Sequence, residues 1–223
     1  MNFTRNLREI LKNLNVLRMK KVVTLCSIVC LALGAKAQTS FGPMLGLNLS
    51  NASTKVFGDK IDTKMKIGFH VGAIANIAIG DHFSIMPGVL YSGKGAKIDD
   101  VDATASLNYI EVPINVAYWF GQPDGGRFFI QAGPYLGYCL GGKAKIDGMD
   151  DETFKIGNDE MEDDFKALDF GVNLGLGYKL PMGLFAKAQY GLGLANILPG
   201  GDSDNSWKNS NISISVGWLF GGK

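Results

Sequence analysis

Histidine is the residue type in this chain best suited to acid–base or nucleophilic chemistry, and it occurs twice, as His70 and His82. A histidine that activates a serine is the common arrangement in hydrolytic and acyl-transfer sites. The combination available here is His70 with Ser50 or Ser92, and no spacing supports it. The sequence contains no Gly-x-Ser-x-Gly elbow, no phosphate-binding loop and no Cys/His metal cluster. We therefore predict no catalytic residue, no cofactor-binding residue and no metal ligand, and we expect that the protein is not an enzyme.

An acidic segment at 147–164 is the second place where chemistry is conceivable. Oxygen ligands at this density can bind Ca²⁺ or Mg²⁺, including ions that bridge to lipopolysaccharide. The segment has no EF-hand spacing and no repeat, so we interpret it as a solvated acidic loop and keep cation binding as the alternative. Its nine acids are Asp147, Asp150, Asp151, Glu152, Asp159, Glu160, Glu162, Asp163 and Asp164.

Charge is distributed unevenly along the 223 residues, whose formal net charge is +1. This length suggests one domain or at most two, and so small a charge argues against a nucleic-acid partner. The first 37 residues hold seven basic residues and one acid, which leaves 15 basic and 20 acidic residues in 38–223. Two of the three cysteines also lie in the first 37 residues, so Cys139 has no partner for an intramolecular disulfide if that part is removed.

Residues 1–37 are interpreted as an upstream extension followed by a cleavable signal peptide, and 38–223 as the mature domain. Met19-Lys20-Lys21 provides a basic start, 22–33 is apolar, and Ala35-Lys36-Ala37 is a typical cleavage site. The apolar run is too short for a transmembrane helix, which needs about 20 residues. The signal is complete from Met19, so the true start is either Met1 or Met19.

Eight later segments alternate between large apolar residues and small or polar ones, which is the period-two pattern of a strand between two different surroundings. In 110–120 the even positions are apolar or aromatic, whereas the odd positions include Glu111 and Asn115. No charged residue falls on the apolar side of any segment. The segments are approximately 41–50, 66–79, 83–95, 110–120, 127–141, 168–179, 184–195 and 212–220.

The polar side of these strands distinguishes a membrane barrel from a soluble sandwich or lipocalin-type barrel. It is dominated by Gly, Ala, Ser, Asn and Gln with few charges, which suits a crowded interior better than a solvated surface. Glycine at every second position, as at Gly171, Gly175 and Gly177, weakens a flat sheet but fits a tightly curved wall.

Connection lengths also alternate along the chain. Short turns are expected at 80–82, 121–126 and 181–183, and long loops at about 51–65, 96–106, 142–164 and 196–208. Short turns on one side and long loops on the other are typical of outer-membrane barrels. The predicted fold is therefore all-β: an eight-stranded antiparallel up-and-down transmembrane β-barrel, preceded by the signal peptide.

Aromatic residues gather near the predicted short turns and indicate an interfacial girdle. We assign to it Tyr118, Trp119, Phe120, Phe128, Phe129, Tyr178, Trp218 and Phe220. Tyr91, Tyr109, Tyr138 and Tyr190 lie near the opposite strand ends and are candidates for the outer girdle.

Six charged side chains fall on the inward side of the predicted strands. An eight-stranded barrel is filled by side chains, so a diffusion pore is not expected. Buried charges need partners, and we interpret the six as a mutually neutralising network, with a proton or ion path as the alternative. They are Lys66, Lys94, Glu111, Asp169, Lys179 and Lys187.

Several motifs resemble the PorT-like outer-membrane β-barrel family, a mixed group of small outer-membrane proteins in Bacteroidota. The resemblance covers essentially the whole mature chain and implies the barrel rather than a particular activity. Its segments are Gly46-Leu47-Asn48-Leu49-Ser50, Tyr109-Ile110-Glu111-Val112-Pro113-Ile114, Leu168-Asp169-Phe170-Gly171 with Gly175-Leu176-Gly177-Tyr178, Tyr190-Gly191-Leu192-Gly193-Leu194-Ala195-Asn196-Ile197, and Val216-Gly217-Trp218-Leu219-Phe220.

We expect a small barrel in the cell outer membrane with a structural or surface-interaction role, a filled polar interior and long extracellular loops. Its expected partners are outer-membrane lipid and lipopolysaccharide, the barrel assembly machinery, and either extracellular ligands or secretion-system subunits. The family name favours an accessory subunit of a protein secretion system as the alternative function. A narrow porin and a lipid-modifying enzyme are weaker alternatives.

Overall fold

The computed structural model describes residues 39–98, 103–122, 125–146 and 148–221. The predicted upstream extension and signal peptide fall within 1–38 and so lie outside the described residues. Within the described ranges, no helix is long and apolar enough to cross a membrane.

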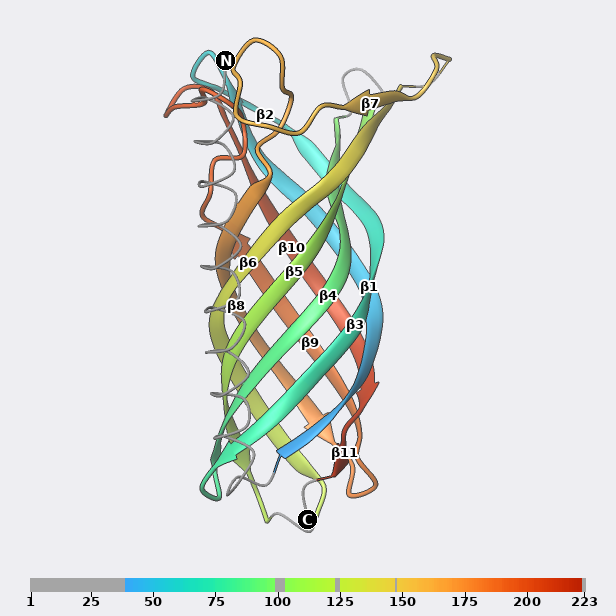
Figure 1. The fold of residues 1–223 in the computed structure, drawn as a ribbon, viewed down its shortest axis with the longest axis vertical. Coiled ribbons are helices and arrows are strands. Elements are labelled where there is room, and N and C mark those ends of the chain that lie inside the picture. The colour runs from blue at the N-terminus through green and yellow to red at the C-terminus, as the bar shows by residue number, and fades with distance from the viewer. Residues whose placement is uncertain (1–38, 99–102, 123–124, 147, 222–223) are drawn as a thin grey trace, which may run out of the picture. The chain divides into compact units, whose positions relative to one another are not determined.

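Eight long strands form a closed antiparallel barrel, as predicted (Figure 1). Each pairs with its neighbour along the chain, and β1 pairs with β10 from Met44↔Gly217 to Lys55↔Ser206, which closes the ring. Three short strands, β2, β7 and β11, add to β1 and β6. The bounds are β1 Thr39–Val56, β2 Asp59–Ile61, β3 Thr63–Ile79, β4 Phe83–Ile98, β5 Ala103–Phe120, β6 Arg127–Ile146, β7 Glu152–Phe154, β8 Leu168–Lys179, β9 Leu184–Gly193, β10 Ser206–Trp218 and β11 Phe220–Gly221.

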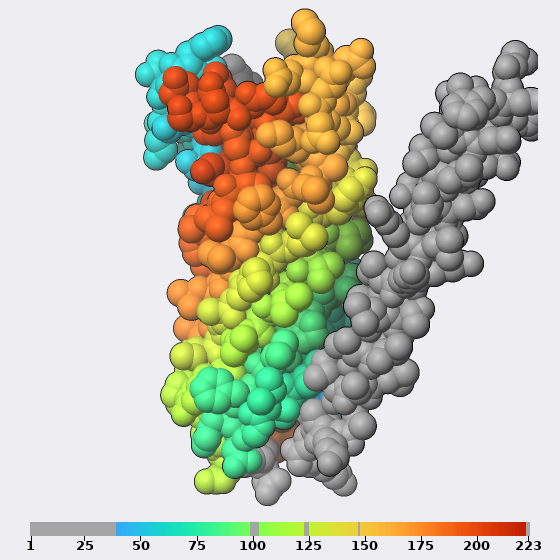
Figure 2. Space-filling model, turned by 60° about the vertical axis from the view of Figure 1, so that its left-hand side comes forward, coloured from blue at the N-terminus to red at the C-terminus, as the bar shows by residue number. Residues whose placement is uncertain are grey.

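The strands run obliquely side by side, as β4, β5 and β6 do across the face in Figure 2, from teal-green to yellow. Their apolar residues point outward: Leu174 is 66% exposed, whereas its neighbour Asn173 is buried in the interior. A soluble barrel would have the opposite arrangement. The outward apolar side therefore requires a hydrocarbon environment.

Glycines on the inward side lie close to neighbouring strands, as their spacing predicted. A Cβ atom added at Gly171 would overlap the carbonyl oxygen of Leu192, and one at Gly133 would overlap that of Ile114. These positions therefore have no room for a side chain.

The strands extend further than their apolar pattern indicated, so the long-loop prediction was wrong at several positions. In the expected loop 51–65, β1 continues to Val56 and β2 and β3 follow. In 96–106, β4 continues to Ile98 and β5 begins at Ala103, and in 142–164, β6 continues to Ile146. Above the hydrocarbon layer both sides of a strand can be polar, so backbone pairing persists after the alternation has ended. We call this side of the barrel the loop end and the side with short turns the turn end.

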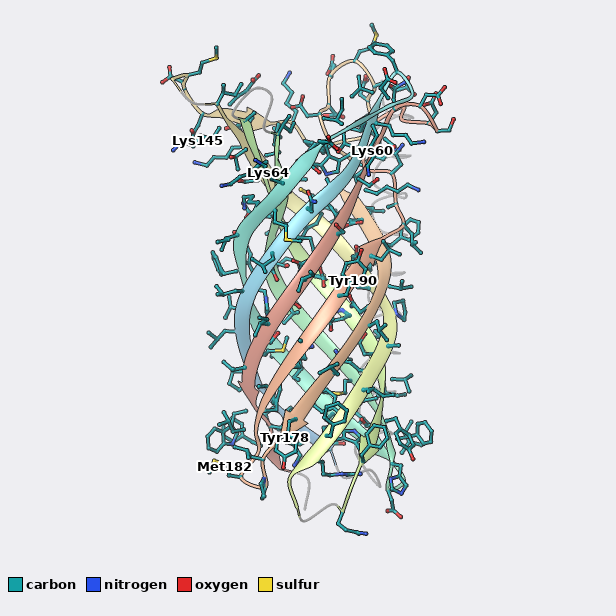
Figure 3. All side chains as sticks on the ribbon, turned by 180° about the vertical axis from the view of Figure 1, so that it is seen from behind. Lys60, Lys64, Lys145, Tyr178, Met182 and Tyr190 are labelled. Atoms are coloured by element: carbon teal, nitrogen blue, oxygen red, sulfur yellow. The ribbon has the colours of Figure 1, made fainter. Side chains whose placement is uncertain are left out.

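The aromatic girdle at the turn end is confirmed for its outward members. Tyr118 contacts Phe83 and Phe120, with ring centroids 5.0 and 4.9 Å apart, and Tyr178 lies at the same end in Figure 3. Three assignments were wrong, because Trp119, Phe129 and Tyr109 are buried inside the barrel. Their odd positions place them on the same side as Glu111 and Gln131.

Candidate functional site

The interior is the natural place to look for a site, and its turn end is filled by an apolar cluster that we call the turn-end plug. Trp119 and Phe129 lie at its centre, with ring centroids 4.6 Å apart, and the Trp119 indole donates to Ser84 Oγ at 2.7 Å. Both rings are buried, at 3% and 0% exposure. The plug consists of Met44, Ile74, Met86, Leu90, Ala117, Trp119, Phe129, Phe185 and Leu219.

A second apolar cluster, the loop-end plug, fills the opposite end. Phe165, from the connection between β7 and β8, packs edge-on against Trp207 with centroids 5.3 Å apart. Backbone hydrogen bonds hold this connection: Cys139 N donates to Ala167 O, and Lys166 N donates to Ile197 O, each at 2.7 Å. The buried members are Ala52, Ala96, Ala105, Leu107, Tyr109, Cys139, Phe165, Ala195, Ile197 and Trp207.

Between the plugs lies a buried charge cluster built by β4, β5 and β8. Lys94 Nζ is 2.5 Å from Glu111 Oε2 and 3.7 Å from Asp169 Oδ2, and all three side chains are almost fully buried. Gly137 stands directly between Glu111 and Asp169 in the strand register. Because glycine has no side chain, the two carboxylates can approach the same ammonium group. The prediction that these charges pair with one another is confirmed for these three residues, but one ammonium faces two carboxylates, so the charges are not balanced.

Neutral side chains bind one carboxylate oxygen of Asp169 and flank Lys94, while Asp169 Oδ1 has no hydrogen-bond partner among the described residues. Asp169 Oδ2 accepts hydrogen bonds from Asn209 Nδ2 at 3.0 Å and from the Tyr135 hydroxyl at 3.4 Å. The Lys94 ammonium also lies 4.2 Å from the centroid of the Tyr135 ring, a favourable cation–π contact. This dense set of partners fixes the charges in place.

The other predicted members do not join this cluster. Lys187 is buried and donates to Gln189 Oε1 at 3.3 Å. Lys66 and Lys179 form no ion pair with any described residue. The predicted network was therefore too broad. It grouped every charged residue on the inward side of a strand, but residues can pair only when they also lie at the same height along the barrel axis.

His70 forms a second polar cluster whose geometry resembles a serine–histidine–asparagine array. Its Nδ1 is 2.9 Å from Asn48 Oδ1, and its Nε2 is 2.9 Å from Ser215 Oγ. The Asn48 amide nitrogen faces the carbonyl oxygens of Phe69 and Gly93, which only accept hydrogen bonds, so Asn48 Oδ1 must accept from His70. His70 therefore carries its proton on Nδ1, and Ser215 donates to Nε2.

Gly46 allows this array to form. It lies between His70 and Ser215 in the register of β3, β1 and β10, and a Cβ at Gly46 would lie 2.6 Å from the His70 ring. Ser50 and Ser92, the serines considered beside His70 and not supported by their spacing, are not hydrogen-bonded to it; Ser92 instead accepts from Asn48 at 3.1 Å. The alternation placed Ser215 on the inward side, but its pairing with His70 follows only from the strand register.

Access decides what the array can do. The cavity beside His70 and Ser215 has a volume of only about 20 Å³ and is bordered by Glu111 and Lys187. This is room for about one water molecule. With a cavity of this size and an apolar cluster toward each end of the barrel, the structure leaves no room for an acyl substrate beside Ser215.

Comparison with known proteins identifies the family. Residues 36–198, well over half of the chain, match the family described as outer membrane protein beta-barrel domain. The chain belongs to this family. As a member of the outer membrane protein beta-barrel domain family, it is a small eight-stranded barrel of the outer membrane, which agrees with its outward apolar side. No curated protein matches it.

Solved structures similar to this family member include three outer-membrane proteins. The Ail attachment invasion locus protein of Yersinia pestis has a TM-score of 0.42 and 12% identity over 82% of this chain and 99% of Ail. Neisserial surface protein A has a TM-score of 0.44 and 16% identity, over 82% of this chain and 99% of its own. OprG from Pseudomonas aeruginosa has a TM-score of 0.46 and 11% identity, over 82% of this chain and 94% of its own. With TM-scores below 0.5, these likenesses carry no argument about function.

The acidic segment of this outer-membrane protein family member uses several carboxylates to shape its own turns. Asp164 accepts from Lys155 N at 2.8 Å, and Asp163 accepts from Asp159 N at 2.9 Å. Lys143 forms an ion pair with Asp151 and lowers the pKa of that carboxyl. In the part of the chain that the structure describes, no three His, Cys, Asp or Glu side chains are grouped to hold a metal ion.

Proposed function

We propose that this protein is a non-conducting, non-enzymatic barrel whose loop end presents an interaction surface to extracellular ligands or partner proteins. The observation that carries the proposal is the combination of a lumen filled by two plugs with strands that continue beyond the apolar band. A lumen filled by side chains offers no path for solutes and no chamber for a ligand. The strands that continue beyond the apolar band instead hold a polar surface above the membrane.

Conductance measurement tests the first half of the proposal. The purified protein, inserted into planar bilayers, is expected to give no unitary conductance steps. Steady steps from the unmodified protein would favour the narrow porin and overturn the proposal. A change in lipid A structure that depends on the gene would favour the lipid-modifying enzyme instead.

The finer assignment to a PorT-like accessory subunit of a protein secretion system is the second candidate. It is supported by the resemblance of segments such as 109–114 and 216–220 to that family. Affinity purification after detergent extraction separates the two candidates, because an accessory subunit brings secretion subunits with it. Recovery of the barrel with surface ligands, but without secretion subunits, would favour the general interaction role.

We also propose that residues 38–223 are the mature chain and that the barrel assembly machinery inserts it beside outer-membrane lipid and lipopolysaccharide. The basic, apolar and cleavage-site order in 19–37 supports export. Mass measurement of protein from outer membranes tests the cleavage: a mature chain that begins at Gln38 is expected, and a retained leader would contradict it.

A further inference from the structure

The turn that joins β1 to β2 contains an unusual residue for its conformation. Val56 pairs with Asp59, so Phe57 and Gly58 are the two turn residues. Their φ angles are +51° and +86°. Positive φ at both positions is the requirement of a type I′ hairpin turn, for which Asn-Gly, Asp-Gly and Gly-Gly are favoured. Here a phenylalanine occupies the position that usually holds Asn, Asp or Gly.

Phe57 does not serve the stability of the fold. A residue with a bulky side chain is strained at positive φ, because its Cβ approaches the backbone. The side chain offers no compensation, since it is 88% exposed and buries almost no apolar area. Backbone strain of this kind is typical of binding and catalytic positions.

Hydrogen bonds from the neighbouring loop hold the strained turn in place. Phe57 N donates to Asn205 Oδ1 at 3.1 Å, and Gly58 N donates to Asp204 O at 2.9 Å. Asn205 is itself fixed, because its N–H donates to Asp202 Oδ1 at 2.8 Å. The ring is therefore presented outward on a braced backbone, which reduces the conformational entropy that a binding partner must overcome.

The height of Phe57 excludes lipid acyl chains as its partner. The outward positions of β1 after Leu49 are polar, namely Asn51, Ser53 and Lys55, and Val56 beside the turn lies on the opposite side of the strand. The eight residues from Leu49 to Phe57 span about 26 Å along the strand, or about 20 Å along the membrane normal at the usual strand tilt. Lys60, on the other side of the same turn, lies at the loop end in Figure 3.

We propose that Phe57 is an anchor residue that inserts into an apolar pocket of an extracellular partner protein. The inference rests on the proposed function and identifies where on the loop end the contact is made. A protruding, immobilised aromatic ring fits a concave apolar pocket, the usual partner of an interface hot spot. An aromatic ring also stacks on the C–H face of a sugar, so a saccharide is the competing occupant, and the periodate sensitivity of a crosslinked adduct distinguishes the two.

Site-specific crosslinking tests the location of the contact. A photoreactive benzoylphenylalanine replaces Phe57 in the full chain, and intact cells expressing it are irradiated. The same residue at Met161, which is 96% exposed on the connection between β7 and β8, is the matched control. We expect a discrete protein adduct at position 57 and none at position 161. An adduct that periodate destroys would identify a saccharide and overturn the proposal.

Binding of the crosslinked protein to purified variants then tests the ring itself. Phe57→Gly is expected to weaken binding at least about thirtyfold, the effect of removing a strong hot spot, whereas Phe57→Leu keeps most of the affinity. Phe57→Gly also relieves the strain, so its urea midpoint should rise, which separates lost binding from lost folding. Equal binding by Phe57→Gly would overturn the proposal. Adducts at position 161 but not at 57 would overturn it while leaving the proposed function intact.

Discussion

Removal of the lysine from the buried charge cluster should destabilise the barrel strongly. In Lys94→Met the carboxylates of Glu111 and Asp169, 2.5 and 3.7 Å from Nζ in the native protein, lose their common cation. Breaking one side of a buried ion pair leaves an uncompensated charge and costs about 3–5 kcal/mol. Methionine keeps much of the volume of the lysine stem, so the loss reflects the charge and not a cavity.

Urea unfolding of the refolded barrel in detergent, followed by tryptophan fluorescence, measures this loss. The matched control is Lys143→Met, because Lys143 also pairs with a carboxylate, that of Asp151, but at an exposed position. Exposed pairs contribute little, so this variant should unfold near the native midpoint. Adding Glu111→Gln to Lys94→Met should recover part of the stability. Equal effects of Lys94→Met and Lys143→Met would refute the reasoning.

Three further outcomes follow from the structure. Gly171→Ala should destabilise the barrel by about 1–3 kcal/mol in the same urea assay, because the added methyl group would overlap the carbonyl oxygen of Leu192 on the neighbouring strand. An unchanged unfolding midpoint would contradict this close approach of the two strands. The lowered pKa of Asp151 means that its contact with Lys143 is fully formed above the ordinary value of 3.8 and is lost as pH falls through the lower folded value. Carboxyl NMR should show Asp151 titrating at a higher pH in Lys143→Met, and an identical curve would speak against the pairing. A fluorophosphonate should leave Ser215 unlabelled in the folded protein, since the adjoining cavity holds only about 20 Å³; rapid labelling, located by peptide mass spectrometry, would show that the lumen opens.

Alternation predicted the barrel well because hydrocarbon imposes a strict rule on every second residue. Alternation did not predict the strands beyond the hydrocarbon layer, where outward residues need not be apolar. The outward side of residues 51–56 is polar, with Asn51, Ser53 and Lys55, yet the segment continues β1 because backbone pairing does not need an apolar side. Trp119 and Phe129 were misplaced because their position near a strand end was given more weight than their odd numbering, which already indicated the interior.

The side-chain contacts inside the barrel were less predictable from the sequence than the strands that form it. Lys94, Glu111 and Asp169 were all placed inside, but their meeting depends on the register of three strands and on Gly137 between two of them. Ser215 reaches His70 only across Gly46. Such contacts join residues far apart in the chain, so no local pattern records them. The strained Phe57 turn was likewise missed, since Phe-Gly is not a usual signal for a tight hairpin.

The β1–β10 seam has a consequence for biosynthesis. Among the described residues, the first and last long strands, β1 and β10, are hydrogen-bonded partners, so the barrel cannot close until β10 has been synthesised. Every earlier product has two open edges, and such edges are not tolerated in lipid. Closure must therefore follow the synthesis of β10, and a polypeptide truncated before β10 should not form a stable barrel in the membrane.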